Sequence, residues 1–315
     1  MLQNVRIADF QIGDVLEGFY ILKDAVSKTT ANGRPYLQCQ ISDNSGFLTA
    51  LYWDYPGPIG AESVGQVVKV RGEVSAYRGQ PQFTGHRIRL ATEKDEYDRA
   101  ALVPTAPIDP EERMEEIRSL IASLDDDDYR RVCEEMLRRH GEVFAAIPAA
   151  KTVHHSFLNG LLMHTSNMLR TADFLADIYS EVIDRNLLLA GTLLHDFAKR
   201  EEFAFSDLSL ATGYTVKGQL LGHLVMGAQE IADVSRELGV PEEKSVLLQH
   251  MLLSHHGQPE FGAAVVPMCA EAELLSEIDL MDSRMEIYAE TLCELPAGSF
   301  SNRVFSLEKK IYRHS

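Results

Sequence analysis

The spacing of apolar residues changes its period along the chain, and this change limits which folds the sequence can adopt. Residues 1–95 contain short runs rich in β-branched and aromatic residues, separated by turn signals such as NGRP (32–35) and DNSG (43–46). From residue 150 onward nearly every segment instead has the apolar spacing of a helix. The sequence therefore predicts a β domain followed by an all-α domain.

The β part predicts five strands, which is the strand number of an OB-fold β-barrel. A Pro/Gly-rich insert, YPGPIGAE (55–62), separates the third strand from the fourth and has room for a short helix. The predicted strands are FYILKDAV (19–26), PYLQCQISD (35–43), FLTALYW (47–53), QVVKVRGEVSAY (66–77) and PQFTGHRIRL (81–90).

The segment GRPYLQCQISDNSGFLTALYWD (33–54) resembles the hairpin of the second and third strands in nucleic-acid-binding OB domains. Such domains bind single strands by stacking bases on exposed aromatic rings and holding the backbone with cations. Each ring has an alternative role in the core, because strand alternation buries about half of the side chains. The candidate nucleic-acid-binding residues are Arg34, Tyr36, Tyr52, Trp53, Tyr77, Arg78 and Phe83, with Lys69, Arg87 and Arg89 as further cations for phosphates.

Residues 96–146 predict a linker and two connecting helices. The Asp-Pro pair at 109–110 signals the start of the first helix, and the second begins in the acidic run 125–128 and ends near Gly141. This run predicts a solvated N-cap turn, because four consecutive side chains point in different directions and cannot converge on one cation. We place the OB-fold domain at 1–95, the all-α domain at 147–300 and a C-terminal tail at 301–315.

Histidines and aspartates recur on or beside the apolar faces of the predicted helices. One such residue is usually a hydrogen-bonded core histidine, but several would be costly to bury separately and are satisfied together by one shared cation. Imidazole nitrogens with carboxylate oxygens suit Zn, Mn, Fe or a related divalent ion, whereas Mg and Ca sites are mostly oxygen. The helical segments that carry these residues are 154–179, 186–203, 218–238, 246–262 and 270–292.

The candidate metal ligands divide into two sets that share Asp196, whose neighbour His195 belongs to the first set. Asp282 could replace Asp279 as a ligand, although Asp282 with Arg284 has the pattern of a surface pair. The sequence does not decide which of His255 and His256 is a ligand. The first set is His164, His195, Asp196 and Asp279, and the second ion would be held by His223, His255 and His256 with Asp196 as a bridge.

The order of a histidine, a His-Asp doublet and a later aspartate resembles the HD-domain phosphohydrolase superfamily, whose fold is a helical bundle. The motifs that carry this resemblance are GLLMHT (160–165), LLHDFAK (193–199) and EIDLMD (277–282). The extra histidines in GH (222–223) and SHHG (254–257) resemble the subgroup with expanded or binuclear sites. With its OB-like N-terminal part, the chain resembles the YhaM-type 3′-to-5′ exoribonucleases, an OB-plus-HD family, over nearly its whole length.

This resemblance implies the direction of hydrolysis and a manganese-dependent activity, with Fe, Zn, Co and Ni as other candidate ions. A divalent ion lowers the pKa of bound water to roughly 7 and neutralises phosphoryl oxygens, so no covalent nucleophile is required. Asp196 and Lys199 are the catalytic candidates, and the resemblance places Lys199 on the scissile phosphate. By the same resemblance His154 and His155 line the entry for the substrate backbone. The alternative for Lys199 is a surface lysine that snorkels at a helix end, and the alternative for the two histidines is helix capping or core packing.

Composition limits the class of partner. The formal charge of −17 argues against a protein that coats duplex nucleic acid through a basic surface. Residues 1–95 hold 10 basic and 10 acidic residues, so the whole excess of negative charge lies on residues 96–315.

No run approaches the roughly 20 apolar residues of a membrane span, and no leader is recognised. The cysteines form no CxxC pair, and we expect a cytoplasmic protein without a membrane partner. A homo-oligomer is compatible with these features.

Three functions follow from these features, and the sequence favours the first. It is a metal-dependent 3′-to-5′ exoribonuclease on single-stranded RNA, with single-stranded DNA as a further substrate candidate. The second is an HD hydrolase of a small nucleotide or cyclic dinucleotide, in which the OB domain is regulatory. The third is a single-stranded nucleic-acid-binding protein with an inactive HD site, which the complete set of expected ligands disfavours.

Overall fold

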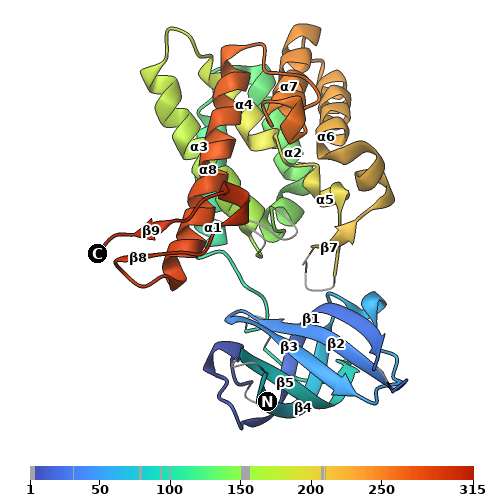
Figure 1. Ribbon diagram of the computed structural model, residues 1–315. Helices are drawn as coiled ribbons and strands as arrows, with labels where there is room; N and C mark the ends of the chain where they lie inside the picture. The colour runs from blue at the N-terminus through green and yellow to red at the C-terminus, as the bar shows by residue number, and fades with distance from the viewer. Residues whose placement is uncertain are drawn as a thin grey trace. The chain divides into compact units, whose positions relative to one another are not determined.

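The protein is described from a computed structural model, which divides into two compact units (Figure 1). One unit is Met1–Thr105 with Phe205–Thr212, and the other is Ala106–Ala204 with Gly213–Ser315. His154, His155 and Arg78 lie outside the described residues, so their predicted roles have no structural counterpart here. The residues described are 4–30, 32–77, 80–92, 94–98, 101–149, 157–206, 209 and 211–315.

The first unit is a closed five-stranded barrel in the order β1-β2-β3-β5-β4. Neighbouring strands are antiparallel except β3 and β5, which pair in parallel. A closed five-stranded barrel of this kind is an OB-fold, and the sequence-based prediction is confirmed. The strands are β1 (Val15–Thr29), β2 (Pro35–Asp43), β3 (Gly46–Trp53), β4 (Val67–Tyr77) and β5 (Gln80–Leu90).

The first strand closes the barrel by pairing on both edges. Residues 15–21 of β1 pair with β4, and residues 21–29 pair with β2, with an irregularity between Leu22 and Asp24. This double pairing explains why β1 is longer than the predicted 19–26. Short 3-10 helices lie before β1, at Ile7–Asp9, and in the insert between β3 and β4, at Ala61–Ser63.

The second unit is a helical bundle arranged around α4. Every residue from Leu187 to Leu194 in α4 is buried, and this helix packs against α2, α3, α7 and α8 (Figure 1). A helix that is apolar all round belongs in the interior of a bundle. The residues that follow α4 therefore lie near the centre of the bundle. The helices are α1 (Pro110–Ala122), α2 (Asp127–Ala146), α3 (Gly160–Ile178), α4 (Arg185–Leu194), α5 (Lys199–Glu202), α6 (Val216–Leu238), α7 (Glu242–Ser254) and α8 (Ala270–Glu294).

The acidic run before α2 is an N-cap turn, as predicted. The carboxylate of Asp126 accepts hydrogen bonds from the backbone N–H groups of Asp128 and Tyr129, at 3.0 and 3.3 Å. Lys244 on α7 donates to both Asp126 and Asp128, at 2.6 and 2.8 Å. The run therefore starts a helix and pairs with a lysine.

Short β elements complete the second half of the chain. A two-stranded sheet joins β6 (Phe203–Phe205) to β7 (Ala211–Tyr214), and another joins β8 (Ser299–Phe300) to β9 (Tyr312–Arg313). A 3-10 helix at Pro259–Phe261 follows α7. Among the described residues, no helix combines the length and apolar character needed to cross a membrane.

The predicted end of α2 near Gly141 is wrong, because the helix continues to Ala146. Gly141 is buried inside this helix, and an added Cβ there would have Met114 Cε as its nearest neighbour, at 3.8 Å. Gly191 in α4 is also helical, but its Cβ would lie 2.5 Å from Met251 Cε and 3.1 Å from Met251 Cβ. Close packing therefore requires glycine at position 191 but not at position 141.

We therefore predict opposite effects for two Gly-to-Ala substitutions. Gly141→Ala should raise the free energy of unfolding by up to about 1 kcal/mol, because alanine favours the helix. Gly191→Ala should lower it by about 1–3 kcal/mol through overpacking. Urea unfolding followed by circular dichroism measures both, and a Gly141→Ala variant as destabilised as Gly191→Ala would contradict this packing.

Candidate metal centre

The His195-Asp196 doublet occupies the turn between α4 and α5. His195 is fully buried and Asp196 is 3% exposed. His195 Nδ1 lies 2.8 Å from the backbone oxygen of Thr192, which can only accept, so Nδ1 carries the proton and Nε2 has a free lone pair. The doublet thus presents one nitrogen and one carboxylate at the centre of the bundle.

His164 on α3 and Asp279 on α8 reach the same place. His164 Nε2 lies 3.3 Å from Asp279 Oδ1, and His164 Nδ1 lies 2.7 Å from Asp282 Oδ2. Asp282 is therefore not the surface residue that its pairing with Arg284 suggested; its side chain is 14% exposed and orients His164.

His223 lies at a break in α6. Gly222 has φ 71° and ψ 161°, a conformation that interrupts the helix and favours glycine. The carboxylate of Glu202 on α5 accepts from the His223 backbone N–H at 3.2 Å and lies 3.0 Å from His223 Nδ1. Glu202 orients this ring, and the sequence analysis did not identify it. No sequence signal distinguishes it from its neighbour Glu201.

His255 and His256 follow the last residue of α7. His255 Nδ1 lies 2.8 Å from the backbone oxygen of Leu252, which leaves Nε2 free. The ring centroids of His255 and His256 are 4.4 Å apart, and the His223 ring is 5.7 and 5.3 Å from them. All three histidines therefore face one another.

Five buried polar atoms at this centre have no hydrogen-bond partner among the described residues. Asp196 Oδ1 is one of them, 3.4 Å from His223 Nε2 and 3.7 Å from His255 Nε2. The candidate ligand atoms form two sets, His164/His195/Asp196 and His223/His255/His256, and within each set all the atoms lie within 4.8 Å of one another. Asp196 belongs to the first set and lies near two histidines of the second. The unpartnered atoms are His195 Nε2, Asp196 Oδ1, His223 Nε2, His255 Nε2 and His256 Nδ1.

These residues fit a divalent cation. Lone pairs of neutral imidazoles and of a carboxylate cannot satisfy one another, and leaving them buried without partners costs free energy. In four histidines the nitrogen away from the centre is held by a protein acceptor, which is the arrangement that orients metal-ligating imidazoles. Those four acceptors are Asp282, the Thr192 carbonyl, Glu202 and the Leu252 carbonyl.

The pKa shifts of His255, His256 and Asp196 agree with binding of a cation, and that of His164 differs. Burial lowers the pKa of His255 and of His256, so both rings are neutral and able to ligate. Burial alone would raise the pKa of Asp196, but Lys199 and His195 hold it well below its usual range. His164 differs: burial lowers its pKa, yet hydrogen bonds to Asp279 and Asp282 raise it to about 9. Ligation by His164 would therefore release a proton.

A cavity of about 340 Å³ opens on this centre. Lys199 reaches it from α5, with Nζ 2.6 Å from Asp196 Oδ2 and a side chain that is 17% exposed. The pKa of Lys199 is raised, because Asp196 outweighs the effect of burial. The wall also contains Phe261 and two carboxylates of α8, Glu273 and Glu277. A charged ammonium thus lies beside the candidate ligands in a space of ligand size.

Comparison with known proteins places this geometry in a family. Residues 161–284 match the model of the HD domain. The 3′-5′ exoribonuclease YhaM of Listeria monocytogenes serotype 4b (strain CLIP80459) is 36% identical over 308 residues, covering 98% of this chain and 97% of that protein. The chain belongs to the YhaM family. Another member, from Halalkalibacterium halodurans, is 34% identical over 304 residues, covering 96% and 94%.

A solved OB-fold is also similar to part of this chain. The second OB-fold domain of replication protein A from Methanococcus maripaludis matches 30% of this chain and 100% of that chain, with 11% identity and a TM-score of 0.22. The strand order, rather than this weak likeness, identifies the barrel.

The barrel residues predicted to bind nucleic acid separate into exposed and buried groups. Trp53 and Tyr77 are 52% and 59% exposed. Tyr36 is half-buried, lies opposite Trp53 across β2 and β3, and has its ring centroid 4.9 Å from that of Trp53. Arg34 is exposed and pairs with Asp54 at 3.4 Å. Arg34, Tyr36 and Trp53 therefore form an accessible aromatic and cationic surface, and Tyr77 offers a further exposed ring at the end of β4.

Tyr52 and Phe83 are corrections to the predicted set. Tyr52 is 2% exposed and Phe83 is fully buried, and both belong to the barrel core. Tyr52 points inward because it alternates with the exposed Trp53 on β3. Neither ring can stack on a base.

Three other histidines, His86, His140 and His250, lie outside the centre. His140 Nε2 is 2.7 Å from Glu230 Oε1, and His250 Nε2 accepts from the backbone N–H of Met268 at 2.9 Å. His86 lies on β5 of the barrel.

We predict that Glu202→Gln weakens Mn²⁺ binding about ten- to a hundred-fold, because an amide nitrogen facing His223 Nδ1 no longer fixes the ring's donor and acceptor sides. Glu201→Gln is the matched control, since Glu201 is more exposed and pairs with Lys217 away from the ligands. Isothermal titration of the metal-stripped protein with Mn²⁺ measures both affinities. Equal affinities for the two variants would contradict the assigned role of Glu202.

Proposed function

We propose that this chain is a metal-dependent 3′-to-5′ exoribonuclease that shortens single-stranded RNA. The observation that supports it most is the convergence of unpartnered imidazole nitrogens and the Asp196 carboxylate beside a cavity that also contains Lys199. Membership of the YhaM family supports the direction of hydrolysis and the substrate class.

In this proposal Asp196 lies between two ligand sets. When bound, a divalent ion such as Mn²⁺ supplies Lewis-acid stabilisation of the phosphoryl oxygens and a lowered pKa for water, so no covalent nucleophile is needed. One ion would be held by His164, His195, Asp196 and Asp279, and a second by His223, His255 and His256 with Asp196. Glu202 and Asp282 position His223 and His164.

Lys199 is the group proposed to contact the scissile phosphate. In the described structure its ammonium is held 2.6 Å from Asp196 and lines the cavity. A lysine side chain has three donors and a flexible stem, so Lys199 can donate to a phosphoryl oxygen while it stays close to Asp196. Its positive charge would stabilise the additional negative charge of the transition state.

The cavity would receive the 3′-terminal nucleotide, and the barrel would bind another part of the strand. Phe261 on the cavity wall is 75% exposed and offers an apolar ring to the terminal base. Trp53, Tyr36 and Tyr77 offer rings to bases, and Arg34 offers a cation to the backbone. Hydrolysis and strand binding are therefore assigned to different units.

We predict that Asp196→Ala abolishes hydrolysis and leaves the affinity for single-stranded RNA largely unchanged. The reason is that Asp196 belongs to one ligand set and lies within 4 Å of two histidines of the other, while the exposed aromatic rings belong to the other unit. A gel ladder from a 3′-hydroxyl RNA measures hydrolysis, and fluorescence anisotropy measures binding. Asp177→Ala, an exposed residue of α3, is the control. Parallel loss of both properties would contradict the division of roles.

We predict the reverse for Trp53→Ala combined with Tyr77→Ala. Binding should weaken by about 1–3 kcal/mol for each ring that stacks on a base, while hydrolysis of saturating RNA persists. The matched control is Phe174→Ala with Tyr179→Ala, two rings of the helical unit that are 66% and 53% exposed. Unchanged affinity in the Trp53/Tyr77 variant would rule out these rings as a stacking platform.

A further inference from the structure

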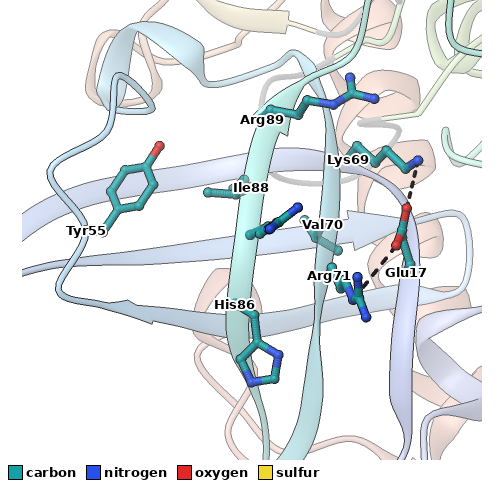
Figure 2. Close-up of a pocket in the computed structure, with 9 residues that line it drawn as sticks. Glu17, Tyr55, Lys69, Val70, Arg71, His86, Ile88 and Arg89 are labelled. Atoms are coloured by element: carbon teal, nitrogen blue, oxygen red, sulfur yellow. Dashed lines mark ion pairs between the residues drawn. The ribbon is translucent and has the colours of Figure 1, made fainter.

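A groove of about 410 Å³ crosses β1, β4 and β5 of the barrel (Figure 2), and Trp53 is not among the described residues that line it. Its lining includes four basic side chains, Lys69, Arg71, Arg87 and Arg89, and one carboxylate, Glu17. The chain as a whole has a net charge of −17, and residues 1–95 contain 10 basic residues. Four of these ten are concentrated in one groove.

The four cations form two pairs that the strand register holds together. Lys69 lies directly opposite Arg89, and Arg71 directly opposite Arg87. Residues that face each other in an antiparallel pair lie on the same face, and like charges in such positions destabilise the sheet. A fold that keeps two such pairs side by side gives up stability there, and such local conflicts are expected at functional sites.

The carboxylates nearby neutralise this charge only in part. Glu17 Oε1 lies 2.8 Å from Lys69 Nζ, and Glu17 Oε2 lies 4.0 Å from Arg71 Nε, as Figure 2 shows. Asp95 binds Arg89 through both oxygens, each at 2.7 Å. Within the described part of the chain, no carboxylate lies within 4.0 Å of Arg87. Two negative charges therefore face four positive ones, and Arg71 is 57% exposed.

A bulge adds His86 to the polar side chains of this face. The register shifts between Arg71 and Gly72, so that Gly72 faces Gly85 and His86 becomes the extra residue on β5. An added Cβ on Gly72 would lie 2.3 Å from the backbone oxygen of Thr84, which makes glycine necessary at this crossing. His86 is exposed and lines the groove.

We propose that this groove, which we call the β4–β5 groove, binds the sugar-phosphate backbone of single-stranded RNA as a second contact surface, separate from the aromatic rings. The proposal rests on the proposed function. Guanidinium groups bind phosphate oxygens in a two-pronged geometry. Positions two residues apart along each strand are about 6.6 Å apart, so the cations form an extended row suited to a chain of phosphates rather than a single anion. Among the described residues that line the groove, Tyr55 is the one Phe, Tyr or Trp, and it is partly buried.

The test compares ionic and stacking contacts through their salt dependence. In the full-length chain with Asp196→Ala to prevent hydrolysis, the Arg71→Gln/Arg87→Gln variant should bind a fluorescein-labelled 20-nucleotide RNA with a salt slope smaller by about 1.4, since each phosphate contact contributes about 0.7. At about 0.1 M salt this corresponds to roughly 25-fold weaker binding. The Trp53→Ala/Tyr77→Ala variant should lose affinity with an unchanged slope.

The matched control removes two exposed arginines of the helical unit, Arg118→Gln with Arg236→Gln, and should change neither slope nor affinity. The thermal midpoint of the Arg71→Gln/Arg87→Gln variant should not fall, because the substitution removes opposed like charges. A slope and affinity equal to those of the parent would overturn the proposal. So would unchanged RNA binding with a changed oligomeric state, which would assign the groove to an acidic protein surface. A parent chain that neither binds nor shortens RNA would instead overturn the proposed function itself.

Discussion

The arrangement of the helical unit depends on one electrostatic constraint at its centre. Asp196 is buried and ionised, and around it lie histidine nitrogens whose lone pairs have no protein donor. Buried acceptors without donors cannot persist at low cost in a well-packed interior. A shared cation would remove this cost for all of them at once, and this is the reason we propose for the convergence of these residues from distant parts of the chain.

The helices supply these ligands mainly at their ends and breaks. His195 and Asp196 follow α4, His223 follows the break at Gly222, and His255 follows α7. A side chain at a helix terminus can point along the axis into the bundle, whereas a mid-helix side chain points outward from it. His164 and Asp279, from α3 and α8, complete the centre from the side.

The sequence identified the residues that converge at this centre better than it identified the residues that orient them. A histidine or aspartate within an apolar helical pattern is conspicuous, because burying it requires a partner. Glu202 and Asp282 are not conspicuous: Glu202 follows another glutamate and Asp282 comes two residues before Arg284, so only the tertiary structure decides which carboxylate faces inward. The same limit applies to the barrel. The five strands follow from alternation and turn signals, but the inward direction of Tyr52 and Phe83 depends on the register that closes the barrel. Gly141 misled the prediction of α2 because glycine within a helix is tolerated where packing supports it.

The most direct test of this account is anomalous diffraction from crystals of the protein grown with Mn²⁺. The account predicts manganese peaks on either side of the Asp196 carboxylate, one beside His164, His195 and Asp279 and the other beside His223, His255 and His256. Absence of any peak next to Asp196, with its carboxylate bound only by Lys199 and protein donors, would contradict the claim that a cation holds this centre together.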